Sequence, residues 1–144
     1  MPSRKASTRW TGDLMSGSGE VSLDTSGAAR FTLTFPTRIG DASKETNPEE
    51  LIAAAHATCF AQNFAGTLAK NDLTSESHEV RSTVTVNKVD DGLAITDIAL
   101  ELEATVPGVD NERFQELASL AERTCPVSKA LAGTKITLTA TLQT

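Results

Sequence analysis

The longest helix that the sequence predicts, over residues 48–70, is apolar on every side. Asn47 can cap this helix, and Pro48 suits its first position. Small residues recur all round it, and larger apolar residues stand between them: Ala53, Ala54, Ala55, Ala57, Ala61, Ala65, Gly66 and Ala69, with Leu51, Ile52, Phe60, Phe64 and Leu68. A helix without a polar face has to be surrounded by other elements. One sheet in a chain of 144 residues covers only one side, so we predict a homodimer with this helix near its centre.

Alternating polar and apolar residues predict about six strands. They fall at residues 9–15, 20–24, 30–35, 79–89, 93–106 and 135–142. Asp90, Asp91 and Gly92 indicate a hairpin between the fourth and fifth strands. Residues 36–45 form a predicted loop that holds Arg38.

A second helix begins after Asp110, which is a suitable cap. Its predicted buried face consists of Phe114, Leu117, Ala118 and Ala121. Thr124, Cys125 and Pro126 break this helix, and a short helical piece continues to Leu131. The fold class is therefore α+β, and residues 1–144 are expected to form a single domain.

The charge and hydropathy of the chain exclude two classes of protein. The formal net charge is −6 and no basic cluster occurs, which argues against nucleic-acid binding. No apolar run is long enough for a membrane span, and the first ten residues lack the apolar region of a signal peptide. We therefore expect a cytoplasmic protein, in which free thiols stay reduced and a structural disulfide is not expected.

The chain has two cysteines, Cys59 and Cys125. Free cysteines are often inert apolar residues, but burial in the middle of a helix should raise the pKa of Cys59, and a reactive thiolate there needs a cation. Arg38 is the nearest loop candidate in the sequence. Glu49 stands about 15 Å along the helix from Cys59, so it cannot touch Cys59 directly. Its help must pass through a bridging arginine or come from the other subunit, whereas Glu50 fits a capping box.

The segments TNPEELIAAAHATCF and CPVSKAL, which end at Phe60 and begin at Cys125, closely resemble the OsmC/Ohr family of thiol-dependent peroxidases. The resemblance covers nearly the whole chain, including VNKVDDGLAITDIALELEATVPGVD. The chain is more similar to the OsmC branch. It has EELIAAAHATCF where the Ohr branch has Gln after the first Glu and Gly-Tyr before the cysteine, and its arginine stands in PTRIG.

The resemblance implies a fold of about six antiparallel-type strands around a central apolar helix, in an intertwined homodimer. It implies reduction of organic hydroperoxides, and more weakly of hydrogen peroxide, as part of a stress response. Cys59 matches the peroxidatic cysteine, and Cys125 matches the resolving cysteine that closes a disulfide with it. Arg38 matches the arginine that activates the thiol, and Glu49 matches the carboxylate that holds this arginine. No metal or bound cofactor is implied, and the external reductant would be a dithiol of the lipoyl type.

Two other hypotheses remain open at the level of the sequence. His56, Cys59, His78 and Cys125 form a Cys₂His₂ set for zinc, although their spacing differs from that of short structural zinc motifs. Alternatively, the protein is a non-catalytic binding dimer whose cysteines are merely buried. The candidates for an apolar substrate entrance are Phe31, Phe35, Phe60, Phe64 and Ile39, which are otherwise expected in the core.

Overall fold

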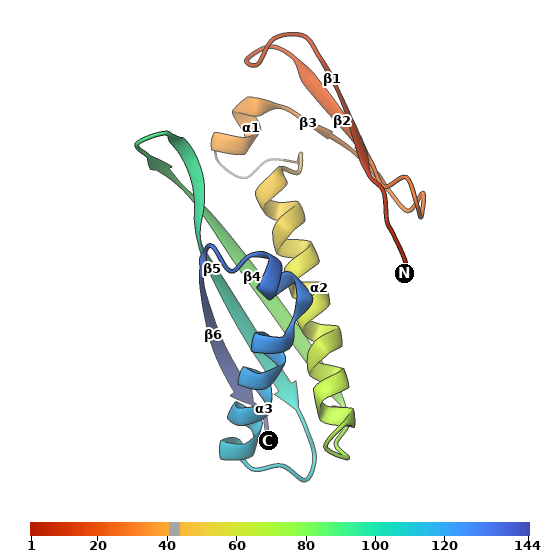
Figure 1. The fold of residues 1–144 in the computed structure, drawn as a ribbon, viewed down its shortest axis with the longest axis vertical. Coiled ribbons are helices and arrows are strands. Elements are labelled where there is room, and N and C mark those ends of the chain that lie inside the picture. Colours follow the sequence, from red (N-terminus) through yellow and green to blue (C-terminus); the bar gives the residue numbers. More distant parts are fainter. Residues whose placement is uncertain (41–43) are drawn as a thin grey trace. The chain divides into compact units, whose positions relative to one another are not determined.

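The computed structural model describes residues 1–40 and 44–144. The chain divides into two compact units, Met1–Leu51 and Ile52–Thr144, and Figure 1 shows the elements of each. The helix α2, Pro48–Ala69, begins in the first unit and continues into the second. The predicted α+β class is confirmed, with six strands in two three-stranded sheets within the described ranges.

The first unit contains an antiparallel sheet of β1 (Ser7–Thr11), β2 (Ser18–Ser22) and β3 (Arg30–Leu33). The strands β1 and β2 begin and end earlier than the sequence predicted. The reason is the turn between them: Gly12 has a φ of 94°, and the Asp13 carboxylate accepts hydrogen bonds from the N–H groups of Met15 and Ser16 at 2.9 and 2.8 Å. This side-chain turn chemistry ends β1 at Thr11.

The predicted loop at residues 36–45 was partly wrong, because a short helix α1, Phe35–Ile39, occupies its first half. Pro36 lies in the first turn, where the missing N–H costs nothing, and the N–H of Gly40 donates to the Pro36 carbonyl at 3.0 Å. Arg38 is thus a helical residue. Residues 41–43 of the predicted loop lie outside the described residues.

The second unit contains a sheet of β4 (Ser77–Val89), β5 (Gly92–Thr105) and β6 (Lys135–Leu142) in that order. β4 and β5 form the predicted antiparallel hairpin, and Gly92 at its turn has a φ of 120°. β6 instead pairs parallel to β5, which corrects the expectation of antiparallel strands throughout. A parallel neighbour needs a long crossover, and the helices α3 (Asn111–Thr124) and α4 (Pro126–Ala130) provide it.

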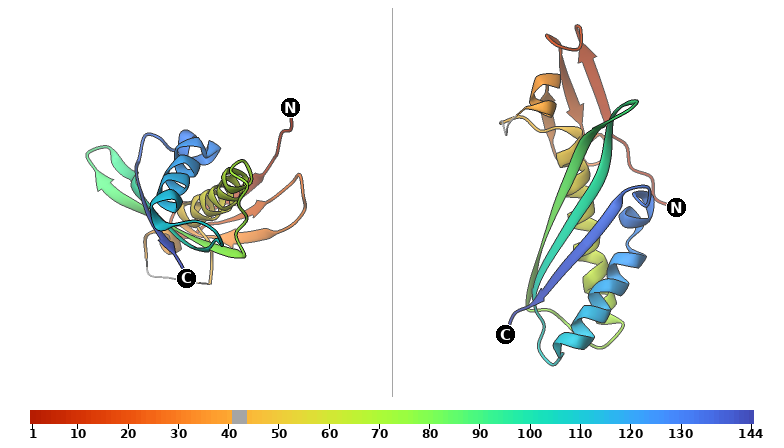
Figure 2. Two further views of the ribbon diagram at one scale, coloured as in Figure 1. Left: turned by 90° about the horizontal axis from the view of Figure 1, so that it is seen from below. Right: turned by 90° about the vertical axis from the view of Figure 1, so that its left-hand side faces the viewer.

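One apolar core joins the helices and sheet of the second unit. Leu100, Leu102 and Ala104, at alternate positions of β5, share it with residues of α2 and α3. Figure 2 shows α3 running along this sheet. The side chain of Asp110 caps α3, and the predicted buried face of that helix is confirmed in full. The Phe64 ring of α2 meets the Phe114 ring of α3 edge-on, with centroids 5.9 Å apart.

The helix α2 has one buried face and one exposed face within the chain. His56, Phe60, Phe64, Thr67 and Leu68 are buried. Beyond the first turn of the helix, the exposed residues are mostly small: Ala54, Ala55, Thr58, Gln62, Ala65, Gly66 and Ala69. The prediction that one chain covers only part of this helix therefore agrees with the burial pattern. None of the described helices is both long and apolar enough to cross a membrane.

Candidate active site

The two cysteine sulfurs meet inside the second unit. Cys59 lies in the middle of α2, and Cys125 lies at the junction between α3 and α4. Their Sγ atoms are 3.4 Å apart, and both cysteines are free. Since a disulfide bond is about 2.05 Å long, the two sulfurs need to approach by only about 1.3 Å to be joined.

Pro126 fixes the position of Cys125. The proline ring disfavours helical geometry at the residue before it, and Cys125 accordingly has an extended backbone with φ −64° and ψ 121°. The chain therefore leaves α3 at Cys125 and starts α4 at Pro126. This change of direction places the Cys125 side chain, which is fully buried, beside α2.

Two polar side chains of α2, one on either side of Cys59 in the sequence, bind the segment around Cys125. His56 Nε2 shares a hydrogen bond of 2.7 Å with Ser128 Oγ on α4. Asn63 Nδ2 donates to the Ala121 carbonyl and to Thr124 Oγ1, at 2.7 and 2.8 Å. From the sequence, His56 was proposed only as a zinc ligand, and this link to Ser128 was not predicted. The spacing in the sequence could have suggested this link. His56 precedes Cys59 by three residues and Ser128 follows Cys125 by three, so two segments that bring the cysteines together can also bring His56 to Ser128.

Opposing influences act on the Cys59 thiol. Burial raises its pKa, the N–H of Val127 that donates to the sulfur lowers it, and the adjacent Cys125 sulfur raises it again. Burial is the largest of these, so the pKa lies above the ordinary value. The expectation of a raised pKa for a thiol in this helix is confirmed. A strong nucleophile at neutral pH therefore needs further stabilisation of the thiolate.

Arg38 and Glu49 form an ion pair within the first unit. Arg38 Nη2 donates to Glu49 Oε1 at 2.7 Å, and Nε donates to both carboxylate oxygens at 3.0 and 3.2 Å. The Glu49 side chain is only 8% exposed, whereas that of Arg38 is 34% exposed. A guanidinium held in this way has a fixed orientation, because the contact involves two of its nitrogens.

Glu50, the neighbour of Glu49, has a different role. Its N–H donates to the side chain of Asn47 at 2.8 Å, which confirms the predicted cap. Its carboxylate accepts a hydrogen bond of 2.6 Å from the hydroxyl of Thr46. The two adjacent glutamates are thus separated in function, one at the helix start and one on Arg38.

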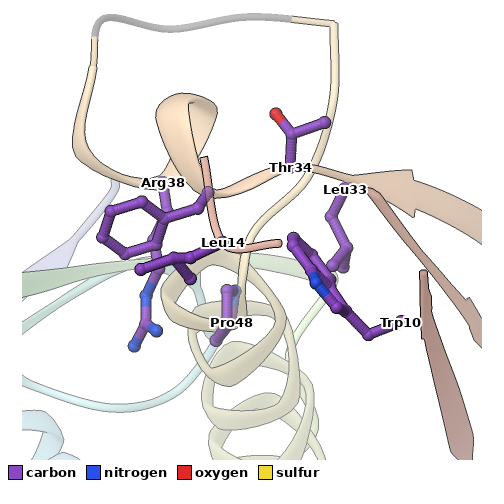
Figure 3. Close-up of a pocket in the computed structure, with 7 residues that line it drawn as sticks. Trp10, Leu14, Leu33, Thr34, Arg38 and Pro48 are labelled. Carbon is purple, nitrogen blue, oxygen red and sulfur yellow. The ribbon is translucent and has the colours of Figure 1, made fainter. Parts of the chain in front are cut away.

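A pocket of about 280 Å³ opens beside Arg38 in the first unit. Its walls are mostly apolar, as Figure 3 shows, and the lining residues are Trp10, Leu14, Leu33, Thr34, Phe35, Arg38 and Pro48. Of the five apolar residues that the sequence offered as an entrance, Phe35 lines this pocket, whereas Phe60 and Phe64 are core residues. Trp10 and Leu14 were missed, because they flank a turn whose position the alternation pattern did not reveal.

The structure thus brings Cys59 to Cys125 and Arg38 to Glu49. The cysteines belong to the unit Ile52–Thr144, and the ion pair belongs to the unit Met1–Leu51.

The proposed Cys₂His₂ zinc set is not assembled. His56 is engaged by Ser128, whereas His78 contacts Ser75 Oγ and the Ala61 carbonyl at 2.7 and 3.0 Å. Among the residues that the structure describes, no group of three or more His, Cys, Asp or Glu residues is placed to hold a metal ion. The arrangement of these side chains therefore does not support the zinc hypothesis.

Comparison with known proteins identifies the family. The model of the OsmC-like protein family matches residues 40–140. The chain belongs to the OsmC family. Peroxiredoxin OsmC of Escherichia coli K12 is 40% identical over 128 residues, which are 89% of each chain. The organic hydroperoxide resistance protein of Xanthomonas axonopodis pv. citri is 34% identical over 74% of this chain and 75% of its own.

Solved structures of the OsmC family share the fold. An organic hydroperoxide resistance protein from Elizabethkingia anophelis superposes with a TM-score of 0.79 at 27% identity, covering 99% of this chain and 98% of its own. OhrB of Bacillus subtilis gives a TM-score of 0.67 at 26% identity, covering 96% and 98%. The resemblance drawn from the cysteine segments is therefore confirmed.

The buried imidazole beside the thiols predicts a pH dependence of stability. Burial lowers the pKa of His56 below the usual 6.5, and the charge of Glu122 opposes this only in part. Below about pH 6.5 the unfolded chain therefore binds a proton that the folded chain does not, and the free energy of unfolding falls until the lowered folded pKa is passed. Urea unfolding midpoints should be lower at about pH 5.5 than at about pH 7.5.

The same measurement on a variant assigns the effect. His56→Gln should flatten the pH dependence, whatever its absolute stability. An equally steep fall in His56→Gln and in the wild type would contradict the assignment.

Proposed function

We propose that this protein reduces organic hydroperoxides to alcohols with the thiols of Cys59 and Cys125. The observation that carries the proposal is the pair of free sulfurs 3.4 Å apart, which belong to the two segments that resemble the OsmC/Ohr motifs. The relatives support it by name, since they include a peroxiredoxin and organic hydroperoxide resistance proteins. The two units would act together as one peroxidase domain, because the family match begins at residue 40 and includes parts of both.

The proposed cycle has three balanced steps. The Cys59 thiolate attacks one oxygen of the hydroperoxide, the O–O bond breaks, and the departing alkoxide takes up a proton to become the alcohol. The Cys59 sulfenic acid then condenses with the Cys125 thiol, which forms the disulfide and releases water. An external dithiol returns both cysteines to thiols by exchange and is itself oxidised to a disulfide.

The apolar pocket beside Arg38 supports an organic substrate. Its walls would bind a hydrocarbon group, while the guanidinium would donate to a peroxide oxygen. Hydrogen peroxide lacks the apolar group and would be the poorer substrate. A lipoyl-type dithiol is the reductant that the family resemblance suggests, and the cytoplasm is the proposed setting because its thiols are kept reduced.

Arg38 is the proposed activator of Cys59, in the same subunit or across a dimer. Its positive charge would stabilise the thiolate that burial disfavours. Glu49 would hold the guanidinium in place through the contacts already described.

Single-turnover kinetics test the division of roles between the cysteines. Cys59→Ser should abolish peroxide reduction and stay folded, because serine is nearly the same size but forms no thiolate. Cys125→Ser should still consume about one equivalent of peroxide and stop at a sulfenic acid or a mixed disulfide. Equal initial rates in the wild type and Cys59→Ser would exclude the mechanism and favour a non-catalytic binding protein.

The role of Arg38 is tested by the pH dependence of Cys59 alkylation in a Cys125→Ser background. Arg38→Ala should raise the pKa of Cys59, and at a pH below that pKa each unit of rise lowers the thiolate fraction tenfold. Arg38→Lys should recover only part of the effect, because an ammonium lacks the planar fork. Glu49→Gln should cause a smaller rise.

Glu50→Gln is the matched control for this series. It removes the neighbouring carboxylate, which binds Thr46 instead of Arg38, so the titration of Cys59 should not move. If the titration is unchanged in Arg38→Ala as well, a different group activates the thiol, and Arg30 and Arg123 are the next to test.

We also propose that the protein is an intertwined homodimer in which the exposed face of α2 is buried. That face consists mostly of alanine and glycine, which allow close approach of another backbone. An added Cβ at Gly66 would meet no atom within 4 Å in the single chain. The monomer therefore has room for a larger side chain at this position.

Sedimentation velocity tests the dimer. The wild type should sediment as twice the chain mass of 15.2 kDa, and Gly66→Glu should dissociate it, because the carboxylate would be buried at the interface. Ser119→Glu, on the exposed side of α3, should leave the dimer intact. A folded wild-type monomer at micromolar concentration would contradict the proposal.

A further inference from the structure

One stripe of α2 makes the described polar and sulfur contacts with the segment that carries Cys125. His56, Cys59 and Asn63 follow one another at spacings of three and four residues, so they lie on one face of the helix. Asn63 binds the end of α3, Cys59 lies against Cys125, and His56 binds Ser128. The three contacts follow the chain from the last turn of α3 into α4.

The helix α4 depends on such contacts for its position. It has five residues, which is little more than one turn and too short to be stable alone. Ser128 is its buried residue, and the Ser128 hydroxyl is bonded to His56. The preceding residue, Val127, donates its N–H to the Cys59 sulfur. A movement of α4 would therefore displace both this donor and the Cys125 sulfur.

The His56 ring is placed for this contact. It is fully buried, and its Nδ1 atom has no hydrogen-bond partner among the described residues. The bond to Ser128 is thus the one polar contact described for the imidazole. Because Nδ1 makes no described hydrogen bond, the bond from Nε2 sets the orientation of the buried ring. Loss of the Ser128 hydroxyl would leave both ring nitrogens without a described partner.

We propose that His56 and Ser128 are positioning residues whose hydrogen bond holds α4 against α2, so that the Cys125 sulfur and the Val127 N–H remain directed at Cys59. This inference rests on the proposed function, in which the two thiols carry the reaction. His56 and Ser128 take no part in the chemistry themselves. They act on it through the placement of one sulfur and one amide.

The positioning has two separate consequences. The Val127 N–H stabilises the thiolate, so a displaced α4 raises the pKa of Cys59. The sulfurs start 3.4 Å apart and need only a small movement to bond, so a displaced α4 also slows closure of the disulfide. A residue that only stabilised the fold would change neither quantity in the folded protein.

The test measures both quantities in Ser128→Ala. The first is the alkylation titration of Cys59 in a Cys125→Ser background. The second is the rate of disulfide closure in the two-cysteine protein, driven once by peroxide and once by a diazene oxidant, which accepts the two thiol hydrogens as it becomes a hydrazine and needs no sulfenic acid. Closure should slow by about fivefold, the factor corresponding to one net hydrogen bond, and the Cys59 titration should move to higher pH.

Four further variants complete the test. Ser128→Thr keeps the hydroxyl and should restore closure to within about twofold of the wild type. Ser82→Ala removes another buried hydroxyl of the same unit, one without a described partner, and should change neither quantity. His56→Phe and the double variant His56→Phe/Ser128→Ala should slow closure as much as Ser128→Ala does, because each breaks the same bond.

The outcomes separate this inference from the proposed function. Closure and titration at wild-type values in a folded Ser128→Ala protein would overturn the positioning role, even if His56→Phe did not fold. If the wild type failed to react with peroxide, the proposed function would fall, yet the alkylation titration and the diazene-driven closure would still show whether the His56–Ser128 bond places the thiols.

Discussion

The packing of α2 against α3 and the start of α4 is the interaction on which the second unit depends. On one side of this contact, Phe64 and Phe114 join the helices in the apolar core. On the other side, His56, Cys59 and Asn63 meet the segment around Cys125. The core and the thiol pair are therefore not independent, because the same interhelical contact places both.

This arrangement has a cost for the chemistry. Burial brings the sulfurs together and excludes water, but it disfavours the thiolate that has to attack. The Val127 amide offsets part of this penalty, and it can do so only because Pro126 ends α3 and allows a new helix to start beside Cys59. Pro126 thus helps to place both the resolving Cys125 and the Val127 N–H that donates to Cys59.

The sequence predicted those parts of the structure that follow from local rules. The buried face and cap of α3, the hairpin at Gly92 and the bounds of β6 were all correct. The prediction failed where a tertiary contact or a single turn decides the structure. The parallel pairing of β6 depends on the crossover as a whole, and α1 depends on one favourable proline in a segment of turn residues. The polar link of His56 required two segments far apart in the sequence to be seen together.

The ion pair of the first unit shows why its two members have to be considered together. Glu49 is nearly buried, so its carboxylate relies on Arg38 to compensate its charge. The better-exposed guanidinium relies on Glu49 less for this. Removing Arg38 alone leaves the buried Glu49 carboxylate without its counter-charge, which costs stability. Replacing both residues avoids the free-energy penalty of an uncompensated buried charge. The fork of Arg38 meets Glu49 through Nε and Nη2, and the contact does not involve Nη1. A guanidinium can thus be oriented by a carboxylate on one edge while another edge remains directed elsewhere, which a lysine ammonium cannot do.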